Sequence, residues 1–230
     1  MLRPTSALLL GIILLALAGE GAATPREEAI MALDRYTSPK GKTLAVTFKG
    51  QLRQIYDRVY HCRPWLDVQK NGLGFSRPVG VAGDDRYLNI WVWVEQKITP
   101  EFAALSPARR ASAMFSRHGV DLLRQISADA SIFADPTLHG YSVILTWIKP
   151  NGRVGNDEKS ETLGVFADKT TVRGFLAKRI GAQEFVKRAA IVAFDGKDPL
   201  GRLPLEIWED DFARTHKLKD YQPEDKNLRC

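Results

Sequence analysis

Histidine and cysteine are scarce in this chain of 230 residues, which contains four histidines and two cysteines. None of them stands at a metal-ligand spacing such as His-x-x-x-His or Cys-x-x-Cys. His118 lies on the apolar stripe of a predicted helix, where a hydrogen-bonded interior histidine is more common than a ligand. The sequence therefore predicts no metal site, and it offers no pattern for a cofactor.

Recognisable catalytic motifs are also missing. The chain has no Gly-x-Ser-x-Gly, no His-Glu-x-x-His, no phosphate-binding loop and no Gly-x-Gly-x-x-Gly. Cys62 follows His61, but a thiol nucleophile needs a base and an orienting group in space, and sequence neighbours rarely point at each other. We assign no catalytic residue. The alternative is an envelope hydrolase built from dispersed residues, with Cys62 and a histidine such as His118 or His139, or Glu95, as candidates.

Long hydrophobic runs are limited to the start of the chain. The run from Ala7 to Ala18 has 12 residues, whereas a membrane-spanning helix needs about 20. Arg3 precedes the run, and Gly21, Ala22 and Ala23 follow it, which is the three-part pattern of a secretory signal. We expect a signal peptide over residues 1–23, no transmembrane span after its cleavage, and a periplasmic or secreted protein. An uncleaved anchor is the alternative.

Charge is present without clustering. The net charge is +6, but no run of five basic residues occurs, so a polybasic tail is excluded. A mild positive charge on an exported protein fits an anionic surface or an unidentified partner of the cell envelope. Export argues against nucleic acid as a partner.

The two cysteines are Cys62 and Cys230. Export permits disulfides, and two cysteines allow one internal pairing. We predict a Cys62–Cys230 bridge, with pairing to another chain through the terminal cysteine as the alternative.

The hydrophobic pattern predicts an α+β fold in which a mainly antiparallel sheet packs with helices. Two N-terminal helices come first, the second ending near Cys62. A strand over 86–96 follows, then a long helix over 107–133 with Ser106 as its N-cap, and a strand pair over 141–150 and 161–167. A helix capped by Asp168, a short helix over roughly 182–188 and two final strands over 190–194 and 203–208 complete the pattern. We expect one globular domain over residues 24–214 and a polar C-terminal tail over 215–230.

The strand over 86–96 carries two kinds of side chain. Leu88, Ile90, Val92 and Val94 share one parity, and a strand sends successive side chains to opposite faces. The other parity is aromatic, and the strand over 141–150 adds more aromatic residues. The candidate binding residues are Tyr87, Trp91, Trp93, Glu95, Tyr141 and Trp147.

Three interpretations of these aromatic residues compete. The aromatic residues could pack under the two N-terminal helices, form a ligand platform, or form a partner surface. The alternation is compatible with all three arrangements. The N-terminal helices have strong apolar stripes that must be buried, which favours packing, with Asn89 and Glu95 at the rim. The preferred binding site is then a groove between helix and sheet.

The sequence thus predicts an exported, non-catalytic binding or accessory protein of the bacterial cell envelope. It would act through the aromatic groove or the mildly basic surface. A structural or interaction protein that docks a partner through its aromatic sheet face is the third possibility.

Overall fold

A six-stranded sheet forms the centre of the protein, with strand order β1-β2-β3-β4-β5-β6. The computed structural model describes residues 24–78, 83–95, 98–154 and 157–208. Every neighbouring pair is antiparallel except β2 and β3, which are parallel. The strands are β1 (Leu66–Ser76), β2 (Arg86–Val94), β3 (Leu138–Val154), β4 (Asp157–Asp168), β5 (Ala190–Asp195) and β6 (Asp198–Gly201).

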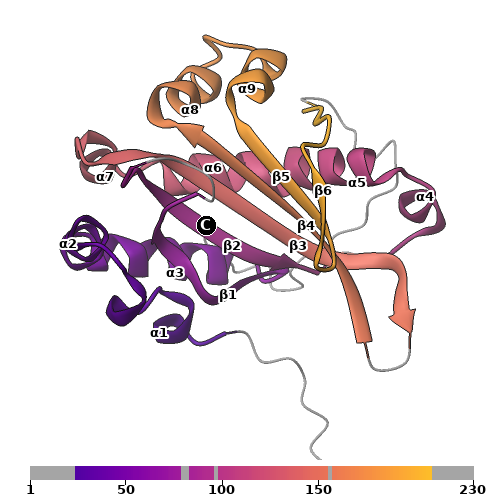
Figure 1. The fold of residues 1–230 in the computed structure, drawn as a ribbon, viewed down its shortest axis with the longest axis horizontal. Coiled ribbons are helices and arrows are strands. Elements are labelled where there is room, and N and C mark those ends of the chain that lie inside the picture. Colours follow the sequence, from indigo (N-terminus) through magenta and orange to yellow (C-terminus); the bar gives the residue numbers. More distant parts are fainter. Residues whose placement is uncertain (1–23, 79–82, 96–97, 155–156, 209–230) are drawn as a thin grey trace, which may run out of the picture.

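Helices connect the strands and pack with the sheet, so the prediction of an α+β fold with a mainly antiparallel sheet is confirmed (Figure 1). The parallel pair requires a long crossover, which α4 to α7 supply. The helical elements are α1 (Arg26–Ala29), the 3₁₀ turn η1 (Leu33–Arg35), α2 (Pro39–Thr47), α3 (Lys49–Cys62), α4 (Pro100–Ala103), α5 (Pro107–Met114), the π-helical turn η2 (Phe115–Gly119), α6 (Val120–Ile126), α7 (Ala130–Ala134), α8 (Lys169–Leu176) and α9 (Ala182–Arg188).

Several predicted helix boundaries agree with the structure, because a capping side chain determines where each of these helices begins. The Ser106 hydroxyl accepts a hydrogen bond from the Arg109 amide, with proline at the first position of α5. The Asp168 carboxylate accepts from the Thr171 amide at 2.8 Å and starts α8. The α3 helix ends at Cys62, as expected from Pro64.

Three boundaries were predicted wrongly. The helix expected over 107–133 ends at Ile126, because the Asp129 carboxylate accepts from the amides of Ser131 and Ile132 and starts α7 separately. The first predicted helix stops at Ala29, where the chain becomes extended and Ile30 pairs with Leu73 of β1. The last strand was expected over 203–208 but is β6, which ends at Gly201.

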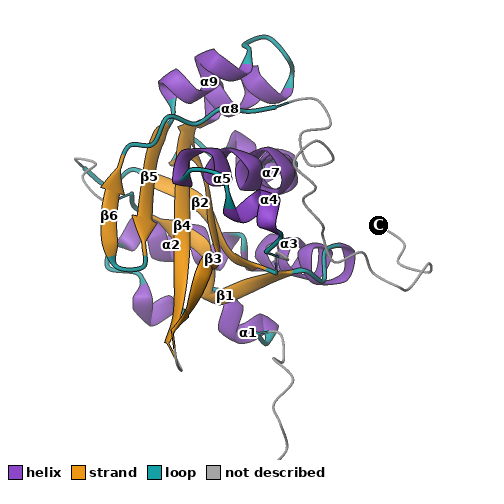
Figure 2. Ribbon diagram, turned by 90° about the vertical axis from the view of Figure 1, so that its right-hand side faces the viewer, coloured by secondary structure: helices purple, strands orange, loops and turns teal. Residues whose placement is uncertain are grey.

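The two faces of the sheet differ in what covers them. Figure 2 shows α3, α5 and α7 on one side of the strands, and in Figure 1 the strands pass in front of α5 and α6. The covered side is the aliphatic face of β2, where Leu88, Ile90 and Val92 are completely buried. Phe48, the residue between α2 and α3, contacts Phe75, the register partner of Leu88, on the same side, with ring centroids 6.0 Å apart.

The prediction that the N-terminal helices cover the tryptophan face is therefore wrong for Trp91 and Trp93. The segment after α1 does reach that side, at the edge strand β1. A Cβ at Gly74 would lie 2.7 Å from the Met31 Cβ and 2.5 Å from the Tyr36 hydroxyl. The absence of a side chain at Gly74 therefore allows this segment to lie against β1, while the faces of β3 to β5 stay outside its reach.

We expect Gly140→Ala to lower the free energy of unfolding by about 3 kcal/mol, the upper part of the range for overpacking. A Cβ at Gly140 would collide with the Ala167 carbonyl oxygen of the neighbouring strand and lie 2.6 Å from the Tyr87 ring. Urea denaturation measures the change. The matched control is Gly50→Ala on the exposed side of α3, where a Cβ meets nothing within 4 Å; there, alanine should be neutral or stabilising by up to about 1 kcal/mol. Equal stability of the Gly140→Ala variant and the wild type would contradict this account.

Candidate functional site

The uncovered side of the sheet is built by two rows of residues in register. One row joins Trp91, Ile144, Gly164 and Val192, and the next joins Trp93, Thr146, Thr162 and Phe194. Partners in register point to the same face. We call this surface the open face and define it by Trp91, Trp93, Ile144, Thr146, Ile148, Thr162, Phe166, Val192 and Phe194.

Large apolar side chains are exposed on the open face. Trp91 is 38% exposed, Val192 40% and Phe194 36%. They stand on β2 and β5, the outer two of four neighbouring strands. No helix among the described residues covers this side of β3, β4 and β5 in Figure 2.

None of the nine residues that define the face carries a charge, but two carboxylates border it. Asp67 of β1 is the register partner of Trp93, and its carboxylate accepts from the Thr24 amide at 2.9 Å. Glu95 is the next residue of the same parity after Trp93 and is exposed.

Three polar side chains of the open face, Trp91, Thr146 and Thr162, bond to one another. The Trp91 Nε1–H donates to the Thr146 hydroxyl oxygen at 2.9 Å, and the hydroxyl oxygens of Thr146 and Thr162 lie 3.0 Å apart within hydrogen-bond distance. This chain of contacts crosses β2, β3 and β4. It holds the Trp91 ring over Thr146, which is 5% exposed, and leaves mainly apolar surface on the outside.

The six candidate binding residues do not form one surface. Tyr141 and Trp147 lie on the helix-covered side and are at most 1% exposed, because Leu88 pairs with Tyr141 and thereby aligns the odd parity of β3 with the aliphatic parity of β2. Trp91 and Trp93 remain together on the open face. Glu95 follows the end of β2 and is exposed.

Tyr87 lies at the far end of the same side but is buried. Its ring lies over Gly140 and near His139 and Phe166, with ring centroids 5.2 Å and 6.4 Å away. Burial, with the negative charges of Asp85 and Asp168, raises the pKa of Tyr87 to about 12. Tyr87 therefore stays neutral and closes this end of the sheet.

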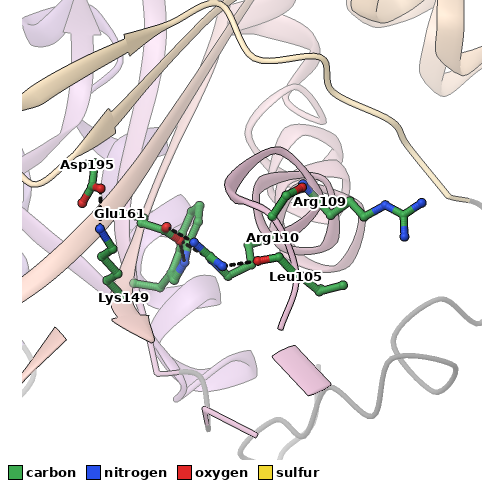
Figure 3. Close-up of polar contacts among 8 residues, drawn as sticks. Leu105, Arg109, Arg110, Lys149, Glu161 and Asp195 are labelled. Atoms are coloured by element: carbon green, nitrogen blue, oxygen red, sulfur yellow. Dashed lines mark hydrogen bonds and ion pairs between the residues drawn. The ribbon is translucent and has the colours of Figure 1, made fainter. Parts of the chain in front are cut away.

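Trp147 belongs to a buried polar cluster under the helices (Figure 3). Its Nε1–H donates to Glu161 Oε2 at 2.9 Å, and Arg110 Nε donates to the same oxygen at 2.8 Å. The second Arg110 nitrogen bonds Glu161 Oε1, and the third bonds the Leu105 carbonyl. Both Glu161 oxygens accept hydrogen bonds, so the arrangement fastens α5 to β3 and β4.

The residues considered for catalysis lie in different surroundings. His118 is buried in η2, and burial, with the nearby charges of Arg117 and Arg63, lowers its pKa to about 3. His139 is half-exposed, with Nδ1 3.7 Å from Asp85 Oδ2. It lines a cavity of about 530 Å³ with Lys40, Asp168 and Lys169. Cys62 is partly buried at the end of α3.

The predicted Cys62–Cys230 bridge stays a prediction, because Cys230 lies outside the described residues. The signal peptide over 1–23 and the polar tail over 215–230 also lie outside them. Within the described part of the chain, no three His, Cys, Asp or Glu side chains gather where they could hold a metal ion. Within the same residues, no helix has the length and apolar character needed to cross a membrane.

Sequence reasoning missed most of the open face. Ile144, Thr146, Val192 and Phe194 were assigned to strands, but their face was unknown. The alternation of "AIVAF" over 190–194 places Val192 and Phe194 on one parity. That signal shows that the two share a face, but not which face.

No protein-family model matches the chain, and neither the curated proteins nor the solved structures contain a significant match.

Proposed function

We propose that this protein is an exported, non-catalytic interaction protein that docks a protein partner on the open face. The observation that carries the proposal is the uncharged surface on four neighbouring strands with Trp91, Val192 and Phe194 partly exposed. Large contiguous apolar patches on a protein surface mark interaction sites, and tryptophan is enriched where binding energy concentrates.

The chemistry of the open face favours a protein over a polysaccharide or an anionic polymer. A sugar site needs polar groups aimed at the ligand, whereas the Trp91 Nε1–H and the hydroxyls of Thr146 and Thr162 are used within the face. An anionic polymer needs lysine or arginine, and none of the nine residues is basic. The gain on binding would come from burial of apolar area.

The shape of the surface also fits a macromolecular partner. Small-molecule sites are concave, and three cavities among the described residues, of about 300, 530 and 280 Å³, are lined by residues outside the open face. The open face is a sheet surface that a second flat surface can cover.

Export and the disulfide belong to the same proposal. The pattern of residues 1–23 supports a secretory signal, and the mature chain would keep Cys62 and Cys230 in an oxidising compartment. An intact-mass measurement of the exported protein, with and without reductant, checks both the new N-terminus and the state of the two thiols. A full-length mass would contradict cleavage.

Site-specific photo-crosslinking in the exporting host tests the docking surface. A photoreactive residue at Val192 should give a discrete adduct, and Trp91→Lys in the same chain should abolish it. The matched control is the same photoreactive residue at Val46 of α2, which is 62% exposed and is not among the nine residues of the open face. No adduct from position 192 above the level at position 46 would overturn the proposal.

A further inference from the structure

We infer that Asp67 and Tyr56 bind the N-terminus of the mature chain. Cleavage between Ala23 and Thr24 then creates an ion pair between the Thr24 ammonium and the Asp67 carboxylate. This role rests on the export that is part of the proposed function, and it adds a processing site together with the residues that receive the new N-terminus. Three features support it: the contacts of Thr24, the lack of a basic partner for Asp67 among the described residues, and the charge that cleavage produces.

Three polar atoms of Thr24 contact the folded domain. Asp67 Oδ1 accepts from the Thr24 nitrogen at 2.9 Å, and the Thr24 hydroxyl donates to Asp67 Oδ2 at 3.3 Å. The Thr24 carbonyl oxygen accepts from the Tyr56 hydroxyl at 2.5 Å. Asp67 stands on β1 and Tyr56 on α3, so contacts with two distant elements fix the position of this residue. Thr24 is also the first residue after the predicted cleavage site.

Asp67 differs in its charge partners from the other carboxylates near the N-terminus. Three of those carboxylates pair with a basic side chain at 2.9 to 3.2 Å: Glu27 with Arg53, Glu28 with Lys70 and Asp57 with Arg26. No lysine or arginine of the described residues forms an ion pair with Asp67, which is half-buried. In a chain that continues through Ala23, the Thr24 nitrogen is a neutral amide. A charged donor at the same position would bind the carboxylate about twice as strongly.

Cleavage supplies this charge. A processing protease of the export pathway hydrolyses the peptide bond between Ala23 and Thr24 and consumes one water molecule. The carbonyl carbon of Ala23 becomes a carboxylate, and the Thr24 nitrogen leaves as an amine that takes up the released proton, since an α-amino group has a pKa of about 7.7–8.0. The ammonium then lies at the place where the nitrogen is 2.9 Å from Asp67 Oδ1. A cut one residue earlier would displace the charge by about 3.8 Å along the chain.

Tyr56 directs the new N-terminus toward Asp67. Its side chain is 5% exposed, and burial, followed by the neighbouring Tyr60 and the negative charge of Asp67, raises its pKa. The Tyr56 hydroxyl therefore keeps its proton and donates to the Thr24 carbonyl. With the carbonyl held on one side, the nitrogen of the same residue faces the carboxylate on the other.

The ion pair lies at the border of the open face. Asp67 is the register partner of Trp93, so the two side chains point to the same face of the sheet. Glu95 is the second carboxylate at this border. The Thr24 ammonium compensates one of the two carboxylates, and cleavage therefore lowers the net negative charge beside Trp93.

A thermodynamic cycle tests the ion pair. Two chains are prepared that begin at Thr24 and at Ala23, so that they have the same net charge, and each is made with and without Asp67→Asn. Urea denaturation under oxidising conditions gives their folding equilibrium constants. In the chain that begins at Thr24, Asp67→Asn should lower this constant about fivefold, the upper end for partly exposed ion pairs. In the chain that begins at Ala23, the loss should stay below about twofold.

A matched control and a comparison without substitution complete the test. Asp34→Asn removes the same charge at an exposed residue of η1 and should change the constant less than about twofold in either chain. Without any substitution, the chain that begins at Thr24 should be about threefold more stable than the chain that begins at Ala23. That difference should shrink between about 0.05 and 1 M salt, because salt screens partly exposed charges.

N-terminal sequencing of the exported protein identifies the residue at which the mature chain begins, and we expect Thr24. A different first residue would overturn the inference, as would equal stability of the two unsubstituted chains or an equal effect of Asp67→Asn in both. These results leave export and the crosslinking at Val192 untouched. An exported protein of full-length mass would reject export and the ion pair together, whereas a missing adduct at Val192 rejects only the docking surface.

Discussion

Arg110→Met should lower the free energy of unfolding by about 3–5 kcal/mol, the range for removing one partner of a buried ion pair. Arg110 and Glu161 have side chains 7% and 4% exposed. The variant leaves the Glu161 carboxylate buried with the Trp147 Nε1–H as its remaining donor in the cluster. A buried charge without its counter-charge is strongly unfavourable. Urea denaturation at neutral pH measures the loss.

Two controls separate the loss of the charge pair from the loss of an arginine. Arg109, the preceding residue, is exposed, and its side chain points away from the cluster in Figure 3. We expect Arg109→Met to change stability by less than about 0.5 kcal/mol, as is usual on surfaces. The double variant Arg110→Met, Glu161→Met should be more stable than Arg110→Met alone, because it removes the uncompensated charge as well. A loss below about 1 kcal/mol in the single variant would mean that Glu161 reaches water, since exposed pairs contribute little.

Lowering the pH from 7 to 4 should cost about 3 kcal/mol of stability through His118 alone. Burial, together with Arg117 and Arg63, lowers the pKa of this histidine to about 3 from an ordinary value of 6.5. Between these two values the unfolded chain binds a proton that the folded chain does not. Stability therefore rises with pH in this window, and the contribution is fully present above pH 6.5 and lost as the pH falls toward 3.

The pH effect is measured by denaturation at several pH values. His118→Gln should flatten the dependence between pH 6.5 and 4.5. NMR titration of the ring protons gives a second test that needs no variant. A His118 ring that protonates near pH 6 in the folded protein would refute the prediction.

The sequence predicted local structure correctly wherever a single nearby side chain determines that structure. Asp168 begins α8 by accepting from the Thr171 amide, and the sequence shows that cap directly. The predicted short helix over 182–188 has the same bounds as α9. The predictions failed where a contact with a residue distant in the sequence replaces the local structure. Ile30 continues the apolar pattern of the first predicted helix, but in the structure it pairs with Leu73, more than forty residues later in the chain.

The alternation over 87–95 was enough to show that β2 has an aliphatic face and an aromatic face. It did not show which face of β3 lies beside which face of β2. Side chains alternate with a period of two, so a shift of one residue in the register exchanges the faces. The structure pairs Leu88 with Tyr141, and this single register places Trp147 under the helices and Ile144 beside Trp91.

The sequence by itself determined the class of the fold, the caps and the two-sided character of its strands, because these depend on residues close together in the chain. Only the tertiary structure decided that both groups of helices cover the same aliphatic side and that Trp91, Val192 and Phe194 share the open face. That outcome depends on strand register and on where distant helices find apolar surface to bury. No local pattern encodes either of these, since each depends on contacts between residues far apart in the sequence.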